Sequence, residues 1–276
     1  MEPRPPFAGG ALWHEVTATL ADLPEAVPAR CHLLIPPAEA QIGVVSDLDD
    51  TVIRSNVTSK LRMLRTTFLS NARTRAPFPG VGAFYRALQR GSGPSDFNPI
   101  FYVSSSPWNL YDLLTEFLTI QKIPLGPLML RDWGFGGGDS LPGGGHHSHK
   151  SAQIRRIFDL FPAMPFILIG DSGQEDPEIY HRAVHDFPDR IRAVYIRNVD
   201  PRPQRIQAIE RLGVEVRSAG SSLLLCDDTM GAARHAAEHG WIRPEAVDEI
   251  RVEVMQSAER PAPRAAAELN QDLSTE

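Results

Sequence analysis

This sequence of 276 residues has few cysteines, no long apolar run and no excess of positive charge. Its two cysteines, Cys31 and Cys226, give no disulfide framework and fit a reducing compartment. No apolar run approaches the roughly 20 residues that a membrane-spanning helix needs. Residues 1–12 lack a basic patch followed by an apolar core, so we expect no signal peptide. These absences predict a cytoplasmic protein, either free or peripheral to a membrane.

The charge balance narrows the range of partners. The formal net charge is −6 at pH 7, so the whole molecule is not a general nucleic-acid binder, and we expect no nucleic-acid partner. No segment repeats at a fixed period. The length is enough for one large or two modest domains.

One stretch, residues 43–53, begins as an apolar strand and then turns acidic. Asp47, Asp49 and Asp50 would repel one another at the end of this strand unless a cation compensated them, and carboxylate oxygens suit Mg²⁺. Strand side chains repeat every two residues, so Asp47 and Asp49 can face the same crevice. One carboxylate could attack a phosphoryl group while the other carries a proton. The alternative is an acidic turn that merely ends a strand.

A second polar strand end follows the apolar residues 100–103. Pro107 suits the first position of a helix over 108–118, and Ser106 suits its N-cap. A hydroxyl beside the N–H groups of a helix start can hold phosphate oxygens, so we predict that Ser104 contacts a phosphate group. The alternative is that Ser104, Ser105 and Ser106 are all turn and cap residues.

Lys150 and two further aspartates complete the candidate site. Lys150 starts a predicted helix over 150–161. A cation at a helix start is unfavourable because it opposes the helix dipole, so we expect a negative group near Lys150. The alternative is an ordinary surface lysine. Asp171 follows the apolar strand 166–169 and is a candidate Mg²⁺ ligand. Asp176, just before Pro177, is either a metal contact or the N-cap of the next helix.

The segment after residues 127–130 contains two further candidates. Arg131 could contact substrate phosphate, because a guanidinium matches phosphate geometry, or it could pair with Asp132 or Asp139. Residues 134–145 are dominated by glycine and are too poor in apolar residues to pack. Three histidines within 146–149 either bind a transition metal or are incidental.

Residues 59–76 are basic and contain no acid, within an acidic protein. Their apolar spacing predicts a helix over 59–71. This basic stretch is either a solvated helix face or a rim that attracts a phosphate or an anionic membrane surface.

Strands alternate with helices along most of the chain, which predicts a parallel central sheet with helices on both faces, a three-layer α/β/α fold. We expect a short N-terminal β element in residues 1–40, with strands over 14–20 and 30–35. A catalytic domain follows over 41–257, with a small cap insertion at about 55–95 that includes a helix over 79–90 ended by Gly91. A helix over 203–212 with Gly213 behind it and a helix to 238 capped by Asp228 come next, and 258–276 form a disordered tail.

The candidate residues occur in an order that resembles the haloacid-dehalogenase-like (HAD) phosphatases, and within them the phosphatidate phosphatase family typified by the yeast actin-patch protein. The resemblance runs from about Pro36 to the helix before Gly240. The matching runs are Ser-Asp-Leu-Asp-Asp-Thr-Val-Ile at 46–53, Val-Thr-Ser-Lys at 57–60, Phe-Pro-Gly-Val at 78–81, Tyr-Val-Ser-Ser-Ser-Pro-Trp-Asn-Leu at 102–110, Leu-Arg-Asp-Trp-Gly at 130–134, His-Lys at 149–150 and Gly-Asp-Ser-Gly-Gln-Glu-Asp-Pro-Glu-Ile-Tyr at 170–180. Ser105 departs from the asparagine expected there.

The resemblance implies a Rossmann-like HAD fold and Mg²⁺-dependent dephosphorylation of phosphatidic acid through an aspartyl-phosphate. Asp47 is then the nucleophile and Asp49 the general acid and base, and Asp47, the Asp49 carbonyl, Asp171 and Asp176 are the metal contacts. Substrate phosphate is held by Ser104, Ser105, Lys150 and Arg131. Two alternatives are a phosphatase for a soluble phosphomonoester and a non-enzymatic phospho-acceptor scaffold.

Overall fold

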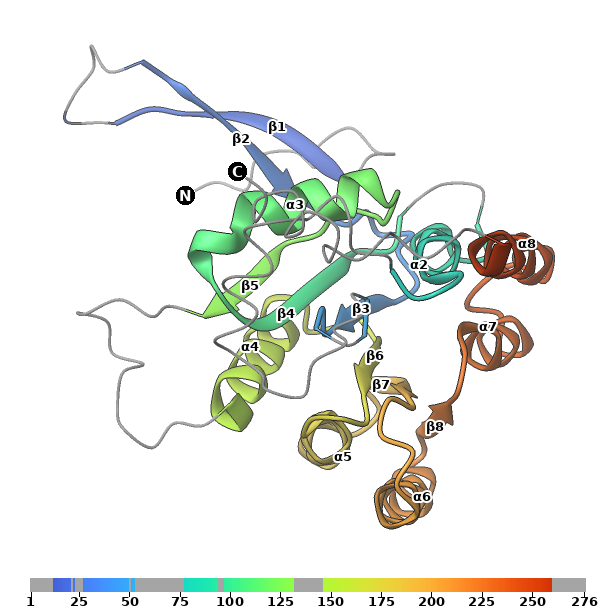
Figure 1. The fold of residues 1–276 in the computed structure, drawn as a ribbon. Helices are drawn as coiled ribbons and strands as arrows, with labels where there is room; N and C mark the ends of the chain where they lie inside the picture. Colours follow the sequence, from blue (N-terminus) through green and yellow to red (C-terminus); the bar gives the residue numbers. More distant parts are fainter. Residues whose placement is uncertain are drawn as a thin grey trace, which may run out of the picture.

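The core of the protein is a six-stranded sheet in the order β5-β4-β3-β6-β7-β8, and all its neighbouring strands are parallel (Figure 1). The structure is a computed structural model that describes residues 12–20, 22, 27–49, 51–52, 77–93, 97–131 and 146–259. The strands of the sheet are β3 (Gly43–Ser46), β4 (Ile100–Pro107), β5 (Leu128–Arg131), β6 (Phe166–Asp171), β7 (Ile191–Arg197) and β8 (Ser222–Cys226).

Helices cover both faces of this sheet, because parallel neighbours need crossover connections. One layer holds α2 (Val81–Arg90), α3 (Tyr111–Ile120), α7 (Thr229–Glu238) and α8 (Ala246–Glu259), and a 3-10 turn, η1 (Trp108–Leu110), precedes α3. The other layer holds α4 (His146–Leu160), α5 (Asp176–Asp186) and α6 (Pro203–Ser218). The predicted α/β, Rossmann-like class with a parallel central sheet is confirmed.

The strand order reverses at β3. From β3 the chain builds outward through β4 to β5, then crosses back to place β6 on the other side of β3, with β7 and β8 beyond it. In such doubly wound sheets, ligands bind at the carboxyl ends of the strands where the order reverses. The topology therefore directs attention to the residues that follow β3 and end β6.

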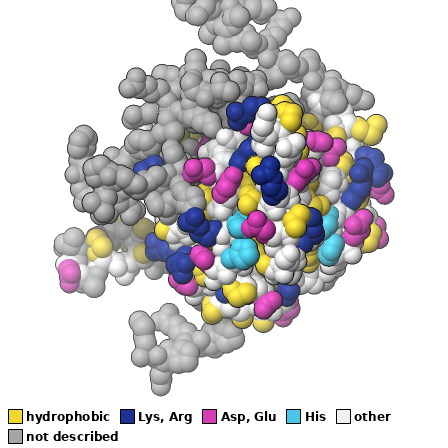
Figure 2. Space-filling model, turned by 90° about the horizontal axis from the view of Figure 1, so that it is seen from below, with side chains coloured by type: hydrophobic (Ala, Val, Ile, Leu, Met, Phe, Trp, Pro, Cys, Tyr) yellow, Lys and Arg dark blue, Asp and Glu magenta, His cyan; other side chains and the backbone are white. Residues whose placement is uncertain are grey.

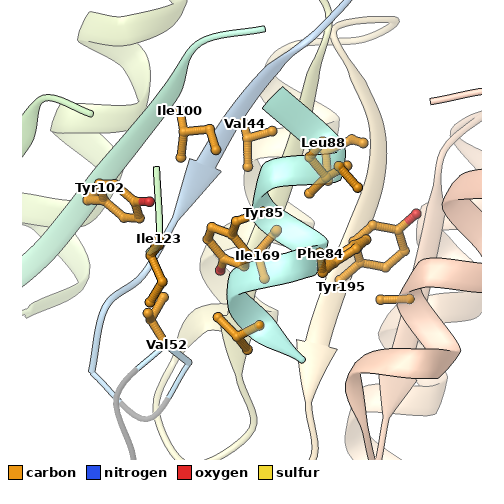
Figure 3. Packing of buried hydrophobic residues seen from close by; sticks show 14 of the residues in the cluster. Val44, Val52, Phe84, Tyr85, Leu88, Ile100, Tyr102, Ile123, Ile169 and Tyr195 are labelled. Carbon is orange, nitrogen blue, oxygen red and sulfur yellow. The ribbon is translucent and has the colours of Figure 1, made fainter. Parts of the chain in front are cut away.

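Helix α2 belongs to the core. Its Tyr85 lies parallel to Tyr102 of β4, with ring centroids 6.4 Å apart, and its Phe84 meets Tyr195 of β7 edge to face (Figure 3). Full burial of such a side chain contributes about 1.5–3 kcal/mol. The part of the expected insertion 55–95 that the structure describes thus contains a layer helix, while residues 53–76, with the basic stretch, lie outside the described residues. The domain boundaries stay predictions.

The two N-terminal strands pair with each other and not with the central sheet. Strand β1 (Trp13–Ala18) runs antiparallel to β2 (Ala29–Leu34), with Trp13 opposite Leu34 (Figure 1). The two predicted strands therefore exist, with ends shifted by one or two residues. Among the described helices, none combines the length and the apolar character that crossing a bilayer requires.

Several element ends differ from the sequence prediction. Ser106 is not an N-cap, because β4 continues through Pro107 and the following turn has no side-chain cap. Helix α6 continues to Ser218, so Gly213 lies inside it, and helix α8 was not anticipated. Two caps are confirmed: Gly91 ends α2 with φ 64°, and Asp228 accepts a hydrogen bond from the Gly231 N–H at 3.0 Å.

Candidate active site

Asp47 lies directly beyond β3, and the alternation of the strand decides where its side chain points. Ser46 faces α2, where its hydroxyl lies 2.7 Å from the Tyr85 hydroxyl and donates to the Asp47 carbonyl at 2.6 Å. The next side chain along the strand points to the opposite face. Asp47 therefore faces α4, and its own N–H donates to the Ile169 carbonyl of β6 at 2.9 Å. These bonds hold the Asp47 backbone between β3, α2 and β6.

Lys150 reaches this carboxylate from α4, which begins about one turn earlier than the sequence predicted. Its ammonium group is buried, donates to Asp47 Oδ1 at 3.0 Å and forms a second ion pair with Asp176 Oδ1. Burial opposes the charge, but the two carboxylates outweigh it and raise the pKa of Lys150 above its ordinary value. Lys150 is therefore charged at neutral pH and is not a surface lysine.

Asp176 does not cap its helix. The N-cap of α5 is Glu175, and no side chain makes a capping hydrogen bond there. Instead Asp176 turns into the site, where Oδ1 pairs with Lys150 and Oδ2 accepts from the Asp171 N–H at 3.2 Å. Asp171 Oδ1 accepts from the Gly173 and Gln174 N–H groups at 2.6 and 3.1 Å. The alternative that Asp176 acts as a cap is therefore wrong.

Gly170 makes this close approach possible. A Cβ at residue 170 would lie 2.4 Å from Asp176 Oδ2 and 2.7 Å from Asp176 Cβ, closer than real contacts allow. We expect Gly170→Ala to push Asp176 away from Lys150, lowering the free energy of unfolding by about 1–3 kcal/mol and the predicted phosphate release by at least about tenfold. Urea denaturation and phosphate release measure the two effects.

The matched control for that substitution is Gly93→Ala, because nothing lies within 4 Å of a Cβ placed at residue 93. The control should leave both quantities unchanged. Wild-type activity in Gly170→Ala would contradict the role given to the packing of Asp176.

Three buried carboxylates converge here. Oxygens of Asp47, Asp171 and Asp176 all lie within 4.8 Å of one another. Burial raises the pKa of Asp47 well above its ordinary value; Lys150 opposes the shift, while Asp176, Asp49 and Asp171 add to it. One ammonium group thus faces several acids, and a hard divalent cation would supply the remaining positive charge. The set of oxygen donors fits Mg²⁺.

Asp49 faces the serine-rich end of β4. Its Oδ2 accepts from the Ser104 hydroxyl at 2.9 Å and from the Ser106 hydroxyl at 3.4 Å. The Ser106 N–H also donates to Ser104 Oγ at 3.0 Å. Hydroxyl groups thus orient the side chain of Asp49, which is not one of the three gathered carboxylates. The metal contact expected through the Asp49 carbonyl stays a prediction.

Ser105 and Arg131 occupy the same edge of the sheet. Ser105 lies in β4 between the two serines that contact Asp49, and Arg131 is the last residue of β5, in register with Pro107. Both stand at carboxyl ends of strands, as the sequence order implied, and their contact with substrate phosphate stays a prediction.

The sequence reading missed the residue that holds the loop after β6. Arg205 of α6 donates from Nε to the Ser172 carbonyl at 2.8 Å and from Nη2 to the Gln174 carbonyl at 2.5 Å, and it pairs with Glu178 of α5. This guanidinium clamps the loop that carries Asp171 and Asp176. The sequence did contain a signal for this role of Arg205. A cation in the first turn of a helix opposes the helix dipole and therefore indicates a negative or carbonyl partner nearby, as at Lys150.

Residues 42–198, which include every residue of this site from Asp47 to Asp176, match the family model described as the catalytic domain of phosphatidate phosphatase APP1. The chain is 35% identical over 157 residues to phosphatidate phosphatase APP1 of Saccharomyces cerevisiae, which covers 56% of this chain and 26% of the yeast protein. It is 29% identical over 166 residues to an uncharacterized protein of Schizosaccharomyces pombe, covering 57% of this chain and 25% of that protein. The chain thus matches about a quarter of the length of these curated relatives.

Proposed function

This chain belongs to the family of the phosphatidate phosphatase APP1 catalytic domain, and from that premise we propose that it is a Mg²⁺-dependent phosphatase that hydrolyses phosphatidic acid to diacylglycerol and phosphate. One observation carries the proposal: Asp47, Lys150, Asp171 and Asp176 come from three separate parts of the chain and meet where the strand order reverses. The name of the yeast relative supports the choice of substrate.

In the first step, an oxygen of Asp47 attacks the phosphorus atom, and the bond from phosphorus to the lipid oxygen breaks. The side chain is suited to this role because Lys150 holds Oδ1, while Oδ2 receives a long hydrogen bond of 3.5 Å from Thr51. Asp49 gives its proton to the leaving glycerol oxygen. The products of this step are diacylglycerol and an aspartyl-phosphate.

In the second step, water attacks the phosphorus atom of the aspartyl-phosphate. Asp49, now ionised, takes a proton from that water, and the bond between phosphorus and Asp47 breaks to release inorganic phosphate. Ser104 and Ser106 keep the Asp49 carboxylate in place between the two steps. In this proposal Ser104 and Lys150 also hold the phosphoryl oxygens.

Asp47, Asp171 and Asp176 would hold the Mg²⁺ ion together with the Asp49 carbonyl. When bound, the ion neutralises the charge that develops on the transferred phosphoryl group. The protein's own contribution is to keep the three carboxylates close, through the Gly173 and Gln174 N–H groups and the Arg205 clamp.

The proposal is tested by a phosphate-release screen on the purified chain, with phosphatidic acid in mixed micelles compared with sugar and nucleotide phosphates and a generic aryl phosphate. We expect release from phosphatidic acid in Mg²⁺, and its loss in EDTA, because the carboxylates then lack the cation that positions substrate. Readdition of Mg²⁺ is the control and should restore release.

The alternatives predict different results in the same screen. Preference for a sugar or nucleotide phosphate would indicate a phosphatase for a soluble phosphomonoester. No release from any substrate, with or without Mg²⁺, would contradict an enzymatic role and favour a phospho-acceptor scaffold.

A further inference from the structure

Two histidines and a glutamate meet on the outer side of α5 and α6. His181 and His185 lie one turn apart on α5 with ring centroids 4.6 Å apart, and His181 Nε2 lies 2.7 Å from Glu215 Oε2 of α6. One ligand atom from each of the three side chains lies within 4.8 Å of the others. Figure 2 looks onto this side of the molecule and shows histidine and acidic side chains next to one another. We propose that these three side chains bind a transition-metal dication of the Zn²⁺ class.

The donor set selects the class of ion. Imidazole nitrogens suit Zn²⁺, Cu²⁺ and Ni²⁺, whereas Mg²⁺ prefers an octahedron of oxygens. Two ligands on a tetrahedral Zn²⁺, each about 2.1 Å from the ion, lie roughly 3.4 Å apart, so the three atoms need only small side-chain movements. His185 and Glu215 are exposed, which leaves a fourth position for water. The site therefore differs in chemistry from the carboxylate cluster at Asp47.

The contact between His181 and Glu215 would not prevent metal binding. It is a single pair at the surface, with the Glu215 side chain 59% exposed, and such pairs contribute little to stability. A metal would use the same nitrogen and oxygen and add the second imidazole. The pair therefore orients two of the three ligands before the ion arrives.

A second histidine pair with the same spacing lacks the third ligand that Glu215 supplies to His181 and His185. His235 of α7 and His239, the C-cap of that helix, have the same spacing. However, Nδ1 of His235 lies 3.0 Å from the Tyr195 hydroxyl, and Nδ1 of His239 lies 2.8 Å from the His235 carbonyl. Among the described residues, no third acid, histidine or cysteine completes a ligand group with this pair. Spacing alone therefore does not make the site on α5 and α6.

A bound ion would link two helices that matter for the candidate active site. Helix α5 starts at Asp176, and His181 and His185 follow roughly 7 and 14 Å along its axis. Helix α6 carries Arg205, which clamps the loop before α5, and also Glu215. An ion shared by His181, His185 and Glu215 would join α5 to α6 beyond this clamp and should stabilise the folded state.

The test is calorimetric titration of the full chain with Zn²⁺ in a large excess of Mg²⁺, which competes with Zn²⁺ for the carboxylate cluster, together with thermal unfolding. We expect one Zn²⁺ per chain and a rise in melting temperature of about 5 °C at saturating Zn²⁺. His185→Ala and Glu215→Gln should each weaken binding at least about tenfold, because each removes a ligand. Both positions are exposed, so neither substitution threatens folding.

Two control variants keep this proposal separate from other sites. His239→Ala removes a histidine of the same spacing, and the double variant His146→Ala with His147→Ala removes two histidines of the run at 146–149. Both should bind Zn²⁺ as the wild type does. Zn²⁺ affinity that is unchanged in His185→Ala and Glu215→Gln, or lost in either control, would overturn the proposal, whatever the outcome for phosphatase activity.

Discussion

Asp47→Asn should lower phosphate release from phosphatidic acid by at least about 10⁴-fold, the largest effect that we expect from any single substitution. The change removes the attacking oxygen and a carboxylate of the candidate metal site, while asparagine keeps the size of the side chain. Stability should not fall, because burial already disfavours the charge of Asp47, as its raised pKa shows. Phosphate release and thermal unfolding in EDTA measure the two effects.

A comparison with Asp49→Asn separates attack from proton transfer. An aryl phosphate has a leaving group that needs no proton, so Asp49→Asn should still be phosphorylated but should hydrolyse slowly, giving a burst of aryl alcohol and a hydroxylamine-sensitive phosphoenzyme. Asp47→Asn should give neither. Asp186→Asn, at the exposed end of α5, is the control and should retain activity within about twofold. A phosphoenzyme in Asp47→Asn would show that another residue is the nucleophile.

Lys150→Met should lower the free energy of unfolding by about 3–5 kcal/mol at neutral pH and the proposed phosphatase activity by about 10²–10³-fold. Lys150 is the ammonium group that pairs with Asp47 and Asp176 in the interior, so the substitution leaves two buried carboxylates without their counter-charge. Urea denaturation in EDTA measures the loss. Lys122→Met is the matched control, because Lys122 is the other described lysine and is exposed, and it should leave stability nearly unchanged.

The stability that Lys150→Met loses relative to the wild type should depend on pH in a defined direction. Burial raises the pKa of Asp47 in the folded state, and Lys150 opposes that shift, so the variant raises it further. A carboxyl group whose pKa is raised by folding destabilises the folded state as pH rises from about 4, the unfolded value, through the folded pKa. The difference in unfolding free energy between the wild type and Lys150→Met should therefore be smallest near pH 4 and largest at neutral pH. An equal deficit at both pH values would contradict the buried charge cluster as its cause.

The sequence predicted the positions of the candidate residues better than their contacts. Asp47, Ser104 and Asp171 each follow a short apolar run, and carboxyl ends of parallel strands meet at one edge, so their neighbourhood followed from local pattern and fold class. The contacts of Ser106 and Asp176 did not follow in this way. A serine before a proline and an aspartate before a proline both have the local pattern of an N-cap, and both instead turn toward the site.

Taken alone, the sequence determined the class of the fold and the edge of the sheet where the acidic residues gather, because strand periodicity and the alternation of strands with helices are local properties. Only the tertiary structure decided that Lys150 lies between Asp47 and Asp176, and that Arg205 clamps the loop between Asp171 and Asp176. These contacts join α4 and α6 to segments distant in the chain. Their formation depends on which helices pack on the same face of the sheet, and no local pattern specifies that choice.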